Sequence, residues 1–221
     1  METFIYMVNN KSSMSKKGLF VVIDGIDYAG KTNALKRVEI NNGLDTPDIQ
    51  KYDGIPKEMG DKTKYNRDNT DPRSRFSFYL GTNKQFSKRI EAETEINNSI
   101  VVRYSLSTTA YHNMMIQESE GTNPHLEEIV KKENFLIPNI TFVVTLSKDD
   151  LEKRMMKRPP QHKHESDANK LMTVQNEFKR LSEQKYKSTF GKVVIIESEK
   201  NKADTVHKIN EYISQYIAEQ Y

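Results

Sequence analysis

Short runs of apolar, mostly β-branched residues recur along the chain and alternate with longer segments of mixed character. The clearest runs lie at 18–24, 99–103, 139–146 and 192–197, and a weaker one lies at 48–52. A continuous apolar run of this length is typical of a strand that is buried on both faces of a parallel sheet. The pattern therefore predicts a central parallel sheet of about five strands.

The segments between these runs carry the signals of helices. Asp71 followed by Pro72 is typical of a helix start, with an N-cap residue before a proline at the first helical position. Ser147 is expected to cap a further helix. Helices are predicted over 31–40, 72–95, 105–117 and 167–187, after Ser147, and from 203 onward. Strands that alternate with helices in this way predict a three-layer α/β/α fold.

Composition narrows the class of protein. The 221 residues are 35% hydrophobic, enough for a single domain with a hydrophobic core. We expect this domain over 18–221, after a flexible polar arm at 1–17. No apolar run approaches the roughly 20 residues of a membrane span, so no membrane partner is expected. The chain contains no cysteine, which favours a cytoplasmic location, and its net charge of +3 argues against nucleic acid as a partner.

The strongest chemical signal follows the first apolar run. The segment GIDYAGKT at 25–32 matches G-x-x-x-x-G-K-[ST], between a predicted strand and a predicted helix. Glycines let backbone N–H groups turn toward a phosphate, and the start of the helix adds positive potential. Lys31 would reach the β and γ phosphates of ATP, and the Thr32 hydroxyl would hold Mg²⁺. The predicted ATP-binding residues are Gly25, Ile26, Asp27, Tyr28, Ala29, Gly30, Lys31 and Thr32.

Two other classes of phosphate-loop protein fit less well. The segment SKDD at 147–150 is similar to the N-K-x-D guanine motif of GTPases, but no D-x-x-G motif follows the phosphate loop. The simpler interpretation is a helix N-cap with acidic residues in the first turn. ATPase motors carry an acidic residue after a second hydrophobic strand, whereas here that strand ends in Val101, Val102 and Arg103.

Several segments taken together resemble the thymidylate kinase family. The segment GLFVVIDGIDYAGKT at 18–32 is similar to the start of these kinases, and RYSLSTTAYH at 103–112 is similar to their D-R-Y-x-x-S-T-x-A-Y segment. RFSFYLGTN at 75–83 resembles the preceding helix, in a variant similar to the mitochondrial UMP/CMP-kinase-type branch. The stretch 151–181 resembles the lid and the helix after it.

The resemblance implies roles for individual residues in binding a nucleoside monophosphate. Asp27 would accept a hydrogen bond from the sugar 3′-OH, and Arg103 would grip the acceptor phosphate with its guanidinium fork. Tyr79 would stack on the base, and Tyr111 would lie against the sugar C2′ and disfavour a 2′-OH. Ser107 and Thr108 match positions near the base edge. The implied substrate-binding residues are Asp27, Arg75, Tyr79, Asn83, Arg103, Ser107, Thr108 and Tyr111.

A basic segment after the fourth apolar run resembles the family's lid. The stretch from Arg154 to His164 contains a proline pair, and it has no acidic residue before Glu165. Mobile basic lids clamp the charge of the transition state and exclude water. We therefore expect a short lid near 154–166, in which Arg154 and Arg158 join Lys31 and Arg103 as catalytic residues.

The chain departs from the family at two positions. Val102 stands where the family has the Asp that helps to organise Mg²⁺ and the acceptor phosphate, and Asp24 is a possible replacement. Asn83 stands where the family has a base-reading Arg, although an amide can still read a pyrimidine edge. Tyr79 could also be explained by core packing in an amphipathic helix.

The resemblance implies a kinase that transfers the γ-phosphate of ATP, with Mg²⁺, to a pyrimidine deoxynucleoside monophosphate. The leading acceptor is dTMP, and dUMP, dCMP or UMP are alternatives. Because of Val102 and Asn83, a nucleotide-binding protein that has lost catalysis remains a second hypothesis. The family also implies a homodimer.

Overall fold

The computed structural model describes residues 17–40, 49–53, 70–160, 166–198 and 202–220. The expected arm at 1–17 therefore lies outside this part of the chain, apart from Lys17. Lys17 pairs with Glu95 at 2.7 Å on the surface. Most of the lid expected near 154–166 is described, but residues 161–165 are not.

The centre of the molecule is the predicted five-stranded parallel sheet, with the strand order β2-β3-β1-β4-β5. Its strands are β1 (Phe20–Gly25), β2 (Ile49–Asp53), β3 (Asn98–Val102), β4 (Ile140–Thr145) and β5 (Lys192–Glu197). All four strand pairings are parallel. The five apolar runs were thus assigned correctly: β5 has the predicted bounds, and the ends of the other four strands differ from the predicted ones by one or two residues.

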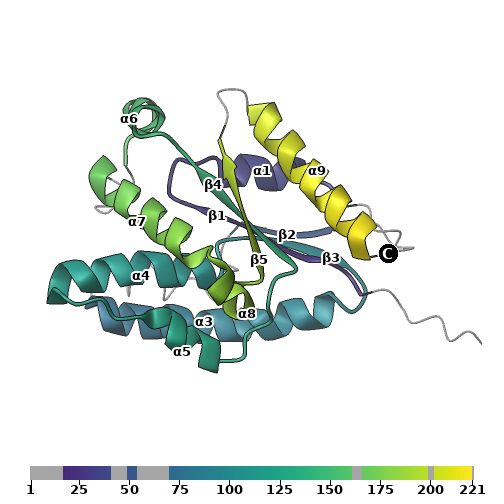
Figure 1. Cartoon of the computed structure of the whole chain (residues 1–221), viewed down its shortest axis with the longest axis horizontal. Coiled ribbons are helices and arrows are strands. Elements are labelled where there is room, and N and C mark those ends of the chain that lie inside the picture. The colour runs from purple at the N-terminus through teal and green to yellow at the C-terminus, as the bar shows by residue number, and fades with distance from the viewer. Residues whose placement is uncertain (1–16, 41–48, 54–69, 161–165, 199–201, 221) are drawn as a thin grey trace, which may run out of the picture.

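Helices cover both faces of the sheet. In Figure 1, α1 (Lys31–Arg37) and α9 (Lys202–Gln220) lie on one side, and α3, α4 and α5 lie on the other. The bounds of the remaining helices are α3 (Pro72–Glu93), α4 (Ser105–Glu120), α5 (Leu126–Lys132), α6 (Lys148–Lys157), α7 (Ala168–Leu181) and α8 (Lys187–Phe190). This arrangement confirms the three-layer α/β/α fold.

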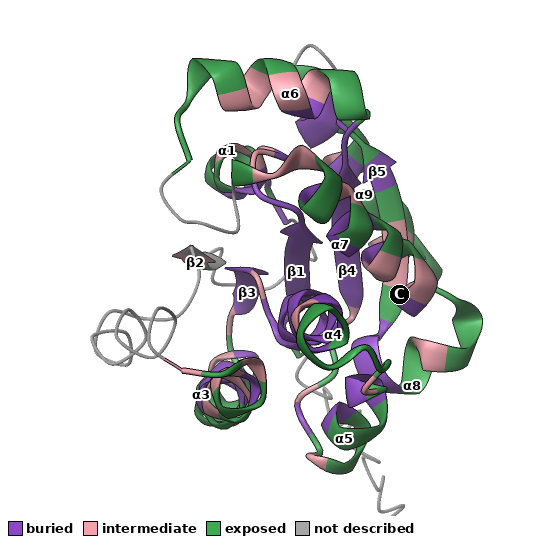
Figure 2. Ribbon diagram, turned by 90° about the vertical axis from the view of Figure 1, so that its left-hand side faces the viewer, coloured by how far each residue is buried: buried purple, intermediate pink, exposed green. Residues whose placement is uncertain are grey.

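The core extends over both faces of the sheet, with buried residues of α4 on one face and of α1 and α9 on the other. Every residue of β1, β3 and β4 is buried, and Figure 2 shows these strands with α4 packed beside them. In α4, eleven of the sixteen residues are buried, although several of them are polar. An apolar core does not require buried Ser, Thr, Asn and His side chains, so their presence at the start of α4 points to a site.

The capping predictions are confirmed. The Asp71 side chain accepts hydrogen bonds from the backbone N–H groups of Arg73 and Ser74, at the start of α3. The Ser147 side chain accepts one from the N–H of Asp150, at the start of α6. The segment SKDD is thus a helix start, as the simpler interpretation held.

Two helix predictions were too long by three or more residues, and two short helices, α5 and α8, were not predicted. The first helix ends at Arg37 instead of 40, since Val38 already has an extended backbone. The helix predicted over 167–187 ends at Leu181, because the chain must turn back to the start of β5. In α5, the buried Glu127 pairs with Arg180 of α7 at 3.0 Å. This helix depends on a tertiary contact that no local pattern indicates.

Candidate active site

The phosphate-loop motif forms a tight turn between β1 and α1, as its sequence predicts. Gly25 has φ 131°, and a Cβ atom there would lie 2.3 Å from the carbonyl oxygen of Val144 in the neighbouring strand. Gly30 has φ 96° and occupies the N-cap of α1. Both positions therefore require glycine, and they turn the loop at the carboxyl end of β1, where ligands of α/β sheets bind.

Lys31 lies at the inner side of the loop. Its side chain is buried, and Nζ donates a hydrogen bond to the carbonyl oxygen of Ile26 at 2.7 Å. The next residue, Thr32, is exposed. The loop thus holds an ammonium group against its own backbone, and the next residue lies at the surface.

Three of the predicted acceptor residues meet beside the loop. Arg103 forms an ion pair with Oδ1 of Asp27, and the hydroxyl of Tyr111 donates to Oδ2 of Asp27 at 2.9 Å. The same hydroxyl accepts a hydrogen bond from the Asp27 backbone N–H at 3.1 Å. Burial and the Asp27 charge raise the pKa of Tyr111 far above its usual value, so the phenol stays protonated.

Arg103 is held in an unusual backbone conformation at this point. Its φ is 66°, in the left-handed region that residues other than glycine rarely adopt. Such conformations cost about 1–3 kcal/mol and cluster at functional sites. The conformation directs a guanidinium group from the end of β3 toward the phosphate loop, a position suited to binding an anion.

A second carboxylate, Asp24, is buried at the end of β1. It is 0% exposed, and its Oδ1 accepts a hydrogen bond from the Ser107 hydroxyl. Its Oδ2 has no hydrogen-bond partner in the part of the chain that the structure describes. Burial raises the pKa of Asp24 to about 6, although Ser107, Lys31 and Arg103 oppose that shift. Ser107 therefore contacts Asp24, and its expected place at the base edge stays a prediction.

The two lid arginines reach the phosphate loop from α6. Arg154 donates to the carbonyl oxygen of Tyr28 at 3.0 Å and to the Ser198 hydroxyl at 3.1 Å. The guanidinium of Arg158 lies over the Tyr28 ring, 4.7 Å from its centroid, at a distance typical of a cation–π contact. The structure thus brings both predicted cations beside the loop that would hold the phosphates of ATP.

The residues expected at the base lie farther out, where α3 packs on α4. The side-chain amide of Asn83 donates to the Thr108 hydroxyl at 2.8 Å, and both residues are buried. The half-buried Tyr79 packs against His112, with ring centroids 5.5 Å apart. Asn83, Thr108 and Tyr79 thus form one wall with His112, a residue to which the sequence assigned no role.

Arg75 makes its contacts with other groups near the start of α3 and on α4. It donates to the carbonyl oxygen of Thr70 at 3.0 Å and contacts the sulfur of Met115 at 3.8 Å. These contacts fix Arg75 at the outer end of the α3–α4 pair. A role for Arg75 in substrate binding therefore stays a prediction.

The donor atoms of the site suit Mg²⁺. The described residues contain no group of three or more His, Cys, Asp or Glu side chains that could hold a metal ion. Mg²⁺ usually takes one or two protein oxygens and completes its shell with phosphate oxygens and water. The hydroxyl of Thr32, an exposed residue of α1, is such an oxygen, and the unpartnered oxygen of Asp24 adds negative charge near the end of β1.

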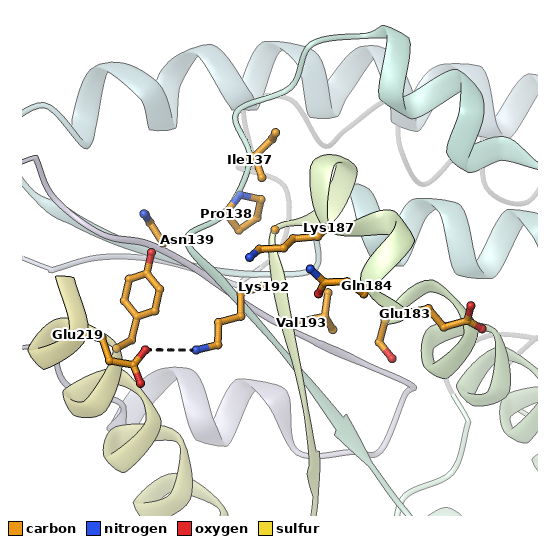
Figure 3. Close-up of a pocket in the computed structure, with 12 residues that line it drawn as sticks. Ile137, Pro138, Asn139, Glu183, Gln184, Lys187, Lys192, Val193 and Glu219 are labelled. Atoms are coloured by element: carbon orange, nitrogen blue, oxygen red, sulfur yellow. Dashed lines mark ion pairs between the residues drawn. The ribbon is translucent and has the colours of Figure 1, made fainter.

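A separate hollow lies at the opposite edge of the sheet (Figure 3). Its volume is about 530 Å³, and it lies where β4 and β5 begin, next to Asn139 and Lys192. Lys192 pairs across it with Glu219 at 3.7 Å. No residue of the phosphate loop lines this hollow, so it is not part of the candidate active site.

Comparisons with known proteins bear on the fold. No protein-family model and no curated protein sequence matches the chain. In structure, the chain is similar to thymidylate kinase from Candida albicans, with a TM-score of 0.69 and 16% identity over 90% of this chain and 92% of that one.

A second similar structure is deoxyadenosine kinase from M. mycoides. In its form with bound dATP the TM-score is 0.61, at 17% identity over 89% of this chain and all of that one. In its form with dCMP and dCDP the TM-score is 0.59, at 15% identity. At these identities the comparisons establish that the chain has the fold of nucleotide kinases with a phosphate loop. In its described residues, no helix is long and apolar enough to cross a membrane.

Proposed function

We propose that this protein is a nucleoside monophosphate kinase, which transfers the γ-phosphate of ATP to a pyrimidine deoxynucleoside monophosphate, with dTMP as the leading acceptor. The observation that carries the proposal is the convergence of Lys31, Arg103 and Arg154 around one phosphate loop. These cations come from three separate elements of the fold. A site of that kind suits two phosphorylated substrates that face each other.

Each cation would have its own task in phosphoryl transfer, which depends mainly on positioning and electrostatic stabilisation. Lys31 and the loop backbone would hold the β and γ phosphates of ATP. Arg103 would hold the acceptor phosphate in line with the γ-phosphate. Arg154 and Arg158 would lie over the transferred group. When bound on Thr32, Mg²⁺ would neutralise charge on the phosphates of ATP.

No general base is required for this reaction. The nucleophile is an oxygen of the acceptor phosphate, which is already ionised at neutral pH. The absence of a carboxylate at Val102 is therefore compatible with turnover. Asp24, one strand away, supplies a negative charge near that position, since Ile23 and Val102 are register partners in β1 and β3.

A second candidate function is nucleotide binding without catalysis. It is favoured by Val102, which is 2% exposed and has no polar atom to offer a metal or a phosphate. Such a protein would be stabilised against heat by nucleotides but would release no ADP.

The test is ADP release from ATP and Mg²⁺ with dTMP, dUMP, dCMP, UMP and CMP, alongside thermal stabilisation by each nucleotide. Turnover that depends on one of these acceptors supports the kinase. Stabilisation without turnover of any acceptor supports the binding protein and contradicts the kinase.

A further inference from the structure

His112 lies at the centre of the wall formed by the expected base-contacting residues. It is one helical turn after Thr108 on α4, and its side chain is 4% exposed. Its ring packs between Tyr79 and Phe76 of α3, with centroid distances of 5.5 Å and 5.7 Å. An imidazole enclosed in this way can offer its polar atoms only to the wall itself or to a base that lies against it.

The hydrogen bond at one ring nitrogen fixes the tautomer of His112. Nδ1 lies 2.7 Å from the carbonyl oxygen of Thr108. A carbonyl oxygen can only accept, so Nδ1 must carry the proton. Burial lowers the pKa of His112 to about 4, an effect that Arg75 strengthens and the bond to Thr108 opposes. The ring is therefore neutral at pH 7, and Nε2 is an acceptor without a proton.

The Nε2 atom of His112 has no hydrogen-bond partner. It is buried, and nothing in the described ranges of the chain donates to it. Buried acceptors are nearly always satisfied in folded proteins, so an unsatisfied one calls for a ligand or a functional reason. Asn83, which bonds to the same Thr108, places a side-chain amide in the same wall.

We propose that Nε2 of His112 accepts a hydrogen bond from the ring N3–H of the acceptor base, and that it thereby selects thymine or uracil over cytosine. This inference rests on the proposed function, since it concerns the acceptor of that reaction. It assigns base specificity to a residue of α4 in addition to Asn83.

The argument depends on the edges of the pyrimidines. Thymine and uracil present an oxygen at C4 and a hydrogen on N3, whereas cytosine presents an amino group at C4 and a lone pair on N3. The amide of Asn83 can serve either C4 group, because it has both a donor and an acceptor and can rotate. His112 has no such freedom, because its only proton is engaged with Thr108. With cytosine, the lone pair on Nε2 of His112 would face the lone pair on N3 of the base.

The test measures the binding of two matched pairs of nucleotides to the full chain by calorimetry. One pair is dTMP and 5-methyl-dCMP, and the other is dUMP and dCMP; within each pair only the reading edge differs. The wild-type protein should bind the thymine or uracil member about tenfold or more tightly, because an unmatched buried polar group is strongly rejected.

Two variants separate recognition from packing. His112→Leu removes the acceptor and should abolish the preference. His112→Gln keeps a polar group that can accept or donate, so it should narrow the preference by improving the binding of the cytosine member. His207→Leu, at an exposed histidine of α9, is the matched control and should bind like the wild type. If His112 only packs the core, each His112 variant should bind both members of a pair more weakly, and by the same factor.

The outcomes for this inference and for the proposed function are distinct. Equal binding within each pair, tighter binding of the cytosine member, or a preference that survives in both His112 variants overturns the inference, even if ADP release shows a kinase. The expected preference without ADP release from ATP upholds it and overturns the kinase. Failure of all four nucleotides to bind overturns both.

Discussion

At the scale of single residues, the site holds groups that weaken the fold. Asp24 is a buried carboxylate with one unsatisfied oxygen, and Arg103 has a left-handed backbone. Such costs persist where function requires them, and the rest of the structure offsets them. Both features lie where β1 and β3 end, next to the phosphate loop.

Asp24→Asn should therefore stabilise the protein at neutral pH. Because the pKa of Asp24 is raised, its carboxyl group holds the proton more tightly in the folded state than in the unfolded state. The stability that protonated Asp24 contributes is therefore lost as the pH rises from about 4 through about 6. Above this pH range, the shift in pKa corresponds to a loss of roughly 3 kcal/mol in the free energy of unfolding. Asn at this position keeps an oxygen that accepts the hydrogen bond from Ser107 but carries no charge. Denaturant unfolding at pH 4 and pH 7.5 measures this. A gain that is no larger at pH 7.5 than at pH 4 would contradict the account of Asp24.

Tyr111→Phe should lower the stability of the fold but leave the preference for the sugar unchanged. The variant leaves the ring in place but removes the hydroxyl that bonds to the carboxylate and the backbone N–H of Asp27. We expect a loss of about 1–2 kcal/mol in the free energy of unfolding. Because the ring remains, the preference for deoxy- over ribonucleotide acceptors should persist, as kcat/KM for dUMP and UMP would report. If the preference disappears, the hydroxyl and not the ring excludes the 2′-OH.

At the scale of elements, the phosphate loop depends on how closely β1 approaches β4. A side chain at Gly25 would collide with the backbone of Val144. Gly121, at the end of α4, also has a positive φ, of 71°, but no atom lies within 4 Å of the position of a Cβ there. Both glycines thus have a positive φ, but Gly25, at 131°, lies outside the left-handed helical region that Gly121 occupies, and its surroundings are far more crowded.

This difference makes a paired prediction possible. Gly121→Ala should cost about 1 kcal/mol, the usual cost of a side chain at such a conformation. Gly25→Ala should cost several kcal/mol more, because strand backbone cannot move aside as a flexible side chain can. Urea denaturation of the two variants measures both values. Equal losses would show that the contact with β4 is not what requires glycine at 25.

The start of the lid is a second element with its own test. Arg154 joins α6 to the phosphate loop and to Ser198, whereas Lys157 of the same helix is exposed. If Arg154 clamps the transferred phosphoryl group, Arg154→Ala should lower kcat by about a thousandfold, as the loss of comparable arginines does. Lys157→Ala should leave kcat unchanged. Similar kcat values for the two variants would remove Arg154 from the catalytic residues.

At the scale of the whole molecule, the sequence predicts the sheet because strands that are buried in a parallel sheet consist of continuous runs of apolar residues. It also predicts the phosphate loop, whose residues are contiguous. Contacts across the fold had to come from the structure. The pairing of Asp27 with Arg103 joins residues 76 positions apart, and the enclosure of His112 depends on how α3 packs against α4. For the same reason, neither α5 nor the end of α7 could be predicted.

The most direct test of the central claim compares Lys31→Ala with Lys36→Ala in the transfer of labelled γ-phosphate from ATP to dTMP. Both lysines lie on α1, but Lys31 is buried in the loop and Lys36 is exposed. The account predicts transfer by the wild type and Lys36→Ala and almost none by Lys31→Ala, with thermal unfolding showing that all three are folded. Near-normal transfer by Lys31→Ala would contradict the assignment of the phosphate loop as the site that holds ATP.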